Sequence, residues 1–554
     1  MRRWYPLRGL TFASAVVLWL AGCALSPVLR AEAIDDSEVG VLTTADGSET
    51  RIRFAELSYT GVAHFVWPDG RSYSGDFVKG QPHGHGIEQL PDGSRYDGDW
   101  TEGRRGAVGT LIFGDGSRYD GQFEAGKRNG QGLFQSTAGR YQGAWIDDMP
   151  QGEGRFDYSD GASYEGFWLG GRRNGFGNYH RNDGSSYEGD WADDVPDGYG
   201  HLIESNNYSY EGGWRDGQRT GYGAMRVGEH FGYEGTWAAN VRQGYGRESR
   251  PDGSEYTGEW SNDRRDGRGT LQMSNGASYE GYWQHNAPIG PGTRTSAEGI
   301  EITGTWDGDF VARGALRLPS GDAYEGNLYD PTTKAVDSRF LEWLQNLANS
   351  GNPDAALLLG HAYRYFLQPA PDRTQASLWY DRAAQAGRAD AQYQLATILF
   401  EESGSMQRGL QLLLSAAAQG HAAANSRLGV FYQQGTYVEK DHAKAQRYYE
   451  AAIVEGDLSA RNNLAWLLAT SPSVELRDGK RAIILAQPLA VLYESWGYLD
   501  TLAAAEAEAG DFAAAARTEQ RAIAQAETGA DPATLQELKQ RLTLFERAEP
   551  YREP

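Results

Sequence analysis

A regular pattern of aromatic residues and glycines fills the chain between residues 59 and 328. Each unit starts at an anchor position, usually Tyr; Gly follows two residues later, and a large apolar residue, mostly Trp, follows four residues later. Because side chains alternate between the two faces of a β-strand, these three positions point to one face. The pattern therefore predicts a series of strands with aromatic rings along one face. The anchors recur every 23 or 22 residues, at Tyr73, Tyr96, Tyr119, Tyr141, Tyr164, Tyr187, Tyr210, Tyr233, Tyr256, Tyr279, Ile302 and Tyr324.

The second half of each unit carries turn signals. A glycine recurs thirteen residues after the anchor, as at Gly177 and Gly200, and pairs such as Asp183-Gly184 close many units. Asp-Gly favours the tight turn of a β-hairpin, and a single hairpin is not stable by itself in water. Each unit is therefore predicted to form a two-stranded hairpin that gains its core by stacking on the next hairpin.

A different pattern begins after the segment Asp330-Pro331-Thr332-Thr333. Glycine becomes rarer, and apolar residues take the i, i+3, i+4 and i+7 spacing of amphipathic helices. A glycine precedes an alanine by four residues and a leucine by eight, at intervals of 33 to 36 residues. This second repeat predicts helix pairs stacked as an α-solenoid. Its glycines are Gly351, Gly387, Gly420 and Gly456.

Both patterns resemble known repeat families. The run Tyr-Glu-Gly-Asp-Trp at residues 187–191 resembles the MORN repeat. Residues 383–387 and 428–435 resemble Sel1-like repeats, and residues 465–469 resemble a tetratricopeptide helix. The resemblance implies an α+β multidomain repeat protein, in which an elongated β-hairpin (MORN) sheet is followed by an α-solenoid of helix pairs. It also implies roles in scaffolding, self-association or membrane association.

The first residues have the pattern of an export signal. Three arginines precede an uncharged stretch from Leu10 to Leu25, which is shorter than the roughly 20 residues that a membrane span needs. The stretch runs through Leu-Ala-Gly-Cys, which resembles the bacterial lipobox and implies cleavage before Cys23 and lipid attachment at Cys23. The alternative is an ordinary signal peptide that is cut after Ala33, so that Cys23 is discarded.

These patterns divide the chain into five parts. Ala24, which follows the cysteine, implies by resemblance a lipid-anchored protein of the outer membrane that faces the periplasm. The alternative location is soluble, either periplasmic or secreted. The parts are a lipoprotein signal peptide at 1–22, an anchor linker with a capping hairpin at 23–58, the MORN array at 59–328, a linker at 329–340 and the Sel1-like and tetratricopeptide α-solenoid at 341–550.

Charge and composition narrow the range of functions. The chain of 554 residues has 52 Lys and Arg against 75 Asp and Glu, which gives a formal net charge of −23. This excess of acids argues against nucleic-acid binding, which needs clustered Lys and Arg, and against direct attraction to anionic lipid. A single Cys rules out an internal disulfide framework and a Cys-rich metal site. The sequence has no phosphate-loop, zinc-protease or serine-hydrolase motif, so it predicts no enzyme, cofactor or metal.

The sequence therefore predicts a non-catalytic, lipid-anchored scaffold or adaptor of the cell envelope that binds protein partners through its repeats. The alternative is a module that binds an envelope glycan through the aromatic MORN face, and phospholipid association is a third hypothesis. The aromatic row is either a core or a groove for sugar rings or an extended peptide. The candidate binding residues are Tyr187, Trp191, Tyr210, Trp214, Tyr233, Trp237, Tyr256 and Trp260.

Overall fold

The computed structural model describes residues 39–553, apart from residues 206, 367–370, 402–404 and 494. The predicted export signal and Cys23 lie outside the described residues. The described chain divides into two compact units. The first holds the residues up to Gly223 together with Ala238–Asn240, and the second holds Ala224–Trp237 and the residues from Val241 onward.

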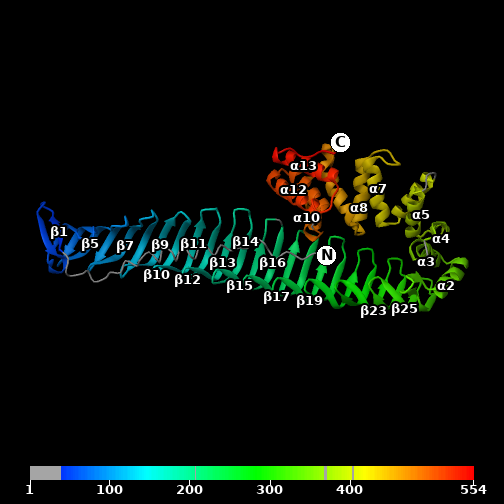
Figure 1. Ribbon diagram of the computed structural model, residues 1–554, viewed down its shortest axis with the longest axis horizontal. Helices are drawn as coiled ribbons and strands as arrows, with labels where there is room; N and C mark the ends of the chain where they lie inside the picture. The colour runs from blue at the N-terminus through cyan, green and yellow to red at the C-terminus, as the bar shows by residue number, and fades with distance from the viewer. Residues whose placement is uncertain (1–38, 206, 367–370, 402–404, 494, 554) are drawn as a thin grey trace. The chain divides into compact units, whose positions relative to one another are not determined.

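Strands succeed one another along the chain from blue to green in Figure 1, and most are joined by tight turns. Their bounds are β1 Val39–Thr44, β2 Glu49–Arg53, β3 Gly61–Val66, β4 Ser72–Val78, β5 Gln81–Gln89, β6 Arg95–Thr101, β7 Arg104–Ile112, β8 Arg118–Glu124, β9 Lys127–Ser136, β10 Gly139–Ile146, β11 Met149–Tyr158, β12 Ser163–Leu169, β13 Arg172–His180, β14 Ser186–Ala192, β15 Val195–Ile203, β16 Tyr208–Arg215, β17 Gln218–Val227, β18 Phe231–Ala238, β19 Val241–Ser249, β20 Glu255–Ser261, β21 Arg264–Gln272, β22 Ser278–Gln284, β23 Ala287–Thr295, β24 Glu301–Asp307, β25 Phe310–Arg317 and β26 Ala323–Asn327. A separate short pair follows, β27 Tyr329–Asp330 with β28 Ala335–Val336.

Strand pairing in each unit is antiparallel and follows the chain. In the first unit β1 pairs with both β2 and β3, and from β3 to β16 each strand pairs with the strand that follows it. In the second unit the same rule holds from β19 to β26. The turn between β1 and β2 contains Asp46 and Gly47, and the Gly47 N–H donates to the Thr44 carbonyl at 2.9 Å.

The hairpin of β12 and β13 shows how the sequence forms one repeat. Gly166 lies opposite Gly177, and a β-bulge shifts the register between Gly166 and Trp168. A Cβ atom placed on Gly177 would lie 2.3 Å from the Tyr164 hydroxyl. Glycine is therefore required there because the tyrosine ring lies directly over its backbone. Rings lying over glycine backbones build a buried core within a sheet of hairpins.

Helices make up the rest of the second unit. The α-helices are α2 Ser338–Asn349, α3 Pro353–His361, α4 Arg373–Gln385, α5 Ala389–Glu401, α6 Met406–Ala418, α7 Ala422–Gln434, α8 His442–Val454, α9 Leu458–Thr470, α10 Gly479–Tyr493, α11 Trp496–Glu508, α12 Phe512–Ala526 and α13 Pro532–Glu546. Three shorter helices are η1 Phe54–Glu56, the π-helix η2 Ala362–Phe366 and η3 Val474–Leu476, of which η1 belongs to the first unit.

Small residues let neighbouring helices approach closely. A Cβ atom on Gly429 of α7 would lie 2.4 Å from the Tyr449 ring of α8, and Ala445 and Ala460 are fully buried. Capping fixes the helix ends: the Asp337 carboxylate accepts hydrogen bonds from the first backbone N–H groups of α2. The predicted fold class is confirmed, because an array of antiparallel β-hairpins precedes a series of packed helices.

Candidate functional site

The candidate binding residues predicted from the sequence lie in the buried row of rings. Tyr187 and Trp191 are 1% and 2% exposed, and their ring centroids lie 5.0 Å apart at an interplanar angle of 85°. The Tyr187 hydroxyl donates to the Asp190 carbonyl, and the Trp191 indole donates to the Gly177 carbonyl of the preceding hairpin, both at 3.0 Å. Burial raises the pKa of Tyr187 above its usual range, so the phenol stays neutral.

The remaining candidate residues share this environment. The structure thus places all of them in the core, where rings make edge-to-face contacts within a strand and also between successive hairpins, as Tyr187 does with Trp214 and Tyr233 with Trp260. Each side chain is at most 5% exposed: Tyr210, Trp214, Tyr233, Trp237, Tyr256 and Trp260.

A buried arginine nine residues after many anchors is a feature that the sequence analysis missed. The Arg173 guanidinium is 4% exposed and lies 4.4 Å from the centroid of the Trp191 ring. Its Nε donates to Asp194 Oδ1 at 3.1 Å, and its Nη2 donates to the Asp194 carbonyl at 2.9 Å. The Arg173 backbone N–H also donates to Asp194 Oδ1, at 3.0 Å. This charge-assisted cluster joins one hairpin to the turn of the next.

The backbone bond of this cluster recurs along the array. It joins a donor arginine to an Asp or Asn that lies seven residues after the next anchor, with a positive φ in every case. The further pairs are Arg128 with Asp148, Arg219 with Asn240, Arg242 with Asp263 and Arg265 with Asn286.

Proline replaces the arginine in other hairpins, and the facing turn residue then changes to glycine. The Gly171 N–H donates to the Pro150 carbonyl at 3.0 Å. Proline has no N–H to donate, so the turn needs no acceptor side chain. The same glycine-to-proline bond joins Gly103 to Pro82, Gly217 to Pro196 and Gly308 to Pro288. Arg105 departs from the rule. The turn position seven residues after the next anchor is Gly126, which has no acceptor side chain, and the Arg105 guanidinium donates to Glu88 instead.

The face opposite the buried rings carries a second row of aromatic residues. Phe176 of β13, Tyr199 of β15 and Tyr222 of β17 each lie twelve residues after an anchor and between two glycines. They are 52%, 58% and 62% exposed, and we call these three residues the exposed stripe. The Tyr199 hydroxyl donates to Glu211 Oε1 at 2.9 Å, a bond that raises the tyrosine pKa.

Comparison with protein-family models assigns both halves of the chain. The MORN repeat model matches ten segments of the hairpin array, and the Sel1 repeat model matches three segments of the helical part. The chain carries MORN repeats and Sel1 repeats. The MORN repeats are residues 73–95, 96–118, 119–139, 141–163, 164–186, 187–203, 210–226, 233–255, 256–278 and 279–300. The Sel1 repeats are residues 353–387, 389–421 and 422–457.

Solved structures include similar chains. A protective antigen of uropathogenic Escherichia coli strains with an SLR fold is 20% identical, with a TM-score of 0.31; the match covers 38% of this chain and 46% of the antigen. A Sel1 repeat protein from Oxalobacter formigenes is 22% identical, with a TM-score of 0.25 and coverage of 38% and 79%. This chain thus spans about half the length of the antigen. No curated protein matches it.

The first two Sel1 repeats are joined by a polar cluster. Asp390 Oδ2 lies 2.9 Å from His361 Nε2, and Asp390 Oδ1 lies 3.5 Å from His421 Nε2. The His361 ring also contacts the Tyr380 hydroxyl through Nδ1 at 3.1 Å. Burial opposes ionisation of Asp390, but its hydrogen bonds from the two histidines outweigh burial and hold its pKa well below the usual range. The cluster is an internal bridge between helices.

A second polar cluster lies beyond the Sel1 repeats. Arg541 of α13 binds the Asp500 carboxylate through Nε at 2.7 Å and through Nη2 at 3.1 Å. Glu519 of α12 is fully buried, 3.8 Å from the Arg541 Nε. Burial first, and then the Asp500 carboxylate, raise the pKa of Glu519 far above its usual range. One arginine therefore faces two buried carboxyl groups, one of which keeps its proton.

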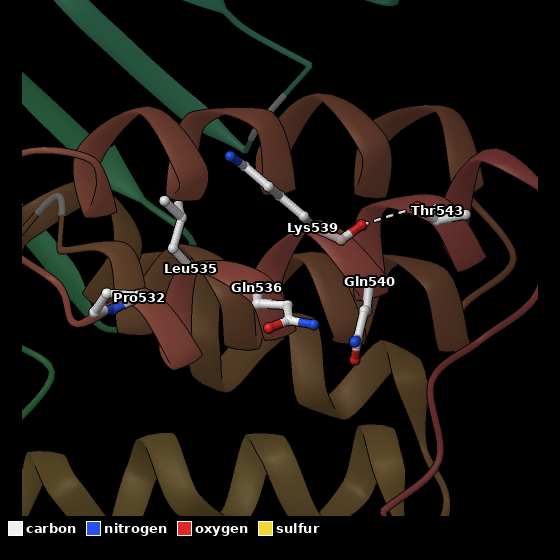
Figure 2. Close-up of a pocket in the computed structure, with 6 residues that line it drawn as sticks. All are labelled: Pro532, Leu535, Gln536, Lys539, Gln540 and Thr543. Carbon is white, nitrogen blue, oxygen red and sulfur yellow. Dashed lines mark hydrogen bonds between the residues drawn. The ribbon is translucent and has the colours of Figure 1, made fainter.

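The outer side of α13 carries a shallow pocket (Figure 2). The Thr543 hydroxyl donates to the Lys539 carbonyl at 2.9 Å, which ties this side chain to its own helix. The pocket offers amide groups, one ammonium group and apolar atoms, and no paired acid and base. It is lined by Pro532, Leu535, Gln536, Lys539, Gln540 and Thr543.

Among the described residues, no group of three or more His, Cys, Asp or Glu side chains is placed to hold a metal ion. Within residues 39–553 and outside the gaps given above, no helix has the length and apolar character needed to cross a bilayer. The MORN and Sel1 repeats instead support a repeat-based scaffold for protein–protein interaction.

Proposed function

We propose that this protein is a non-catalytic scaffold of the bacterial cell envelope, held at the outer membrane by lipid on Cys23 and facing the periplasm. The observation that carries the proposal is the succession of MORN and Sel1 repeats along the chain. Repeats of this kind offer extended surfaces to protein partners. The lipid supplies a fixed location, which raises the effective concentration of partners at the same membrane.

The helical part has exposed side chains that suit a protein partner. Tyr365, Tyr437 and Trp496 are 51%, 45% and 36% exposed. Exposed aromatic residues contribute much of the binding energy at protein interfaces because they bury a large area and lose little rotamer freedom. These residues are therefore the first positions from which to trap a partner.

The anchor is tested with the Cys23→Ser variant in a native bacterial host. We expect wild-type protein to carry added acyl mass and to sediment with membranes, and the variant to lose both. Ala33→Leu is the matched control, because it blocks only the alternative cleavage site and should leave the lipid in place. Soluble wild-type protein that begins after Ala33 would overturn the anchor.

The scaffold role is tested separately by photo-crosslinking in intact cells. A crosslinking residue at Tyr365, Tyr437 or Trp496 should capture one reproducible protein, identified by mass spectrometry. The control position is Leu464, which is fully buried and should capture nothing. Capture of no specific protein from any of the three exposed positions would contradict the proposed contact surface.

A further inference from the structure

The exposed stripe of Phe176, Tyr199 and Tyr222 is an apolar row that the packing of the hairpins does not bury. Its rings are 52–62% exposed, whereas Tyr187 and Trp191, whose rings lie on the other face of the sheet, are 1% and 2% exposed. Aromatic surface that stays in water forfeits the free energy of burial, and such patches commonly mark binding sites. We propose that the exposed stripe binds a neutral polysaccharide chain with β-1,4 linkages, with one ring under every second sugar. This site is independent of the scaffold role.

The neighbour that faces Tyr199 across the strands leaves room for a flat ligand. Tyr199 lies opposite Gly213 of β16, so this neighbour on the same face carries no Cβ atom beside the ring. The hydrogen bond from the Tyr199 hydroxyl to Glu211 ties the ring to the neighbouring strand. A ring held in place before binding loses little conformational freedom when a sugar stacks on it.

The spacing of the rings matches a glycan. Each hairpin adds two strands, so equivalent residues in successive hairpins lie about 10 Å apart. Consecutive sugars of a β-1,4 chain turn over, so the same sugar face returns once per disaccharide, a length close to this spacing. In an extended peptide, side chains on the same face recur every two residues, about 7 Å, so their spacing does not match the spacing of the rings.

In a polyproline helix, side chains on the same face recur once per turn, about every 9 Å, which is close to the ring spacing. Such a helix, however, docks into grooves lined by several aromatic residues. Phe167, in the same hairpin as Phe176, is 47% exposed, but Asp190 and Gly213 take the equivalent position in the next two hairpins, so each of these offers a single stripe ring for stacking. The arrangement therefore favours a sugar ring over a proline.

Charge on the same face selects against other partners. Carboxylates lie beside the rings, and a chain with a net charge of −23 repels anionic polymers and a second copy of itself. Several of these acids already have partners: Glu165 binds Arg155 at 3.2 Å, and Asp190 accepts the Tyr199 backbone N–H at 2.9 Å. These carboxylates should therefore bind a polycation weakly, but their remaining lone pairs can accept hydrogen bonds from sugar hydroxyls.

The test measures binding of the full chain to soluble oligosaccharides by calorimetry. The probes are cello-oligosaccharides and chito-oligosaccharides of two, four and six sugars, with maltohexaose as the linkage control. Affinity should rise in steps as each further disaccharide reaches another ring, by about tenfold per ring. Maltohexaose should bind at least tenfold more weakly than the β-1,4 hexamers.

The matched variants replace exposed rings only. The combined changes Phe176→Ser, Tyr199→Ser and Tyr222→Ser should abolish the gain with oligosaccharide length while the circular dichroism spectrum stays unchanged. Phe366→Ser and Tyr493→Ser remove exposed rings from the helical part and should leave glycan affinity unchanged. The proposal is overturned by no binding to any β-1,4 hexamer, by equal binding of maltohexaose, by undiminished binding in the triple variant, or by preference for a polyproline peptide.

Discussion

Replacing Asp194 with Gly tests how much the ion pair between two MORN hairpins contributes to stability, without changing the conformation of the turn. Asp194 has a φ of 72°, which glycine adopts without strain, so the change removes the carboxylate and little else. It leaves the Arg173 guanidinium, only 4% exposed, without the Oδ1 acceptor that serves both its Nε and its backbone N–H. Removing one partner of a buried ion pair costs about 3–5 kcal/mol.

The expected loss is about 3 kcal/mol, the lower end of this range. The carbonyl of residue 194 still accepts a bond from Arg173 Nη2, and the guanidinium still lies over the Trp191 ring. Asp194→Asn keeps an Oδ1 acceptor, as Asn240 does beside Arg219, and should cost about 1 kcal/mol or less. A double variant with Arg173→Pro and Asp194→Gly reproduces the Pro150 and Gly171 pair and should recover most of the loss.

Hydrogen exchange read by mass spectrometry suits this test, because repeat arrays open locally. Peptides that cover residues 172–195 should exchange roughly a hundredfold faster in Asp194→Gly, as a loss of about 3 kcal/mol requires. Peptides from the helices serve as the internal control. Equal exchange in the Gly and Asn variants, or no recovery in the double variant, would refute the account of the ion pair.

Two further predictions concern the core and the pH response. Gly177→Ala places a Cβ atom 2.3 Å from the Tyr164 hydroxyl and should destabilise its hairpin by about 1–3 kcal/mol, seen as a lower denaturation midpoint; Gly497→Ala, whose Cβ atom meets nothing within 4 Å, is the control and should cost nothing. Because burial raises the pKa of Glu519, the folded state holds a proton that the unfolded chain releases once the pH exceeds the ordinary carboxyl range. The stability of the helical part should therefore be greatest at about pH 5 and fall toward alkaline pH, and Glu519→Gln should flatten this slope in thermal unfolding. A wild-type midpoint that is constant with pH would contradict the assignment.

The hairpins and the helices could be predicted because their signals are local and repeated. The alternation of Tyr164, Gly166 and Trp168 places all three on one face of a strand, and the recurring Asp-Gly pairs mark turns. The sequence could not show that the facing glycine backbone covers each ring. That covering decides between a core and an open groove, and it depends on strand register and on the bulge between Gly166 and Trp168.

The exposed stripe and the arginine clusters had sequence signals that were harder to interpret. The stripe appears in sequence as Gly-aromatic-Gly, for example around Tyr199, and only the structure shows which face that ring occupies. Arginine and proline exchange at the ninth position, as at Arg173 and Pro196, without an evident reason in sequence alone. The reason is the partner in the next hairpin, 21 residues away in the case of Asp194 and Arg173.

The pairing between successive turns limits how the array can change its length. Loss of residues 256–278 would bring Arg242 to face Asn286, a combination with the same donor and acceptor types as the Arg219 and Asn240 pair. This unit could therefore be deleted or duplicated alone without leaving an unmatched junction.

Among the four units that span residues 141–232, where arginine and proline alternate, the array can gain or lose repeats only in twos. Deleting residues 164–186 would bring Pro150 to face Asp194, whose carboxylate would lose the N–H that it binds, whereas deleting residues 164–209 would bring Pro150 to face Gly217 and restore a matched junction. Recombination within the gene would thus yield stable products at some repeat boundaries and strained ones at others. The pairing of turn residues between successive hairpins therefore restricts the number of repeats that the array can contain.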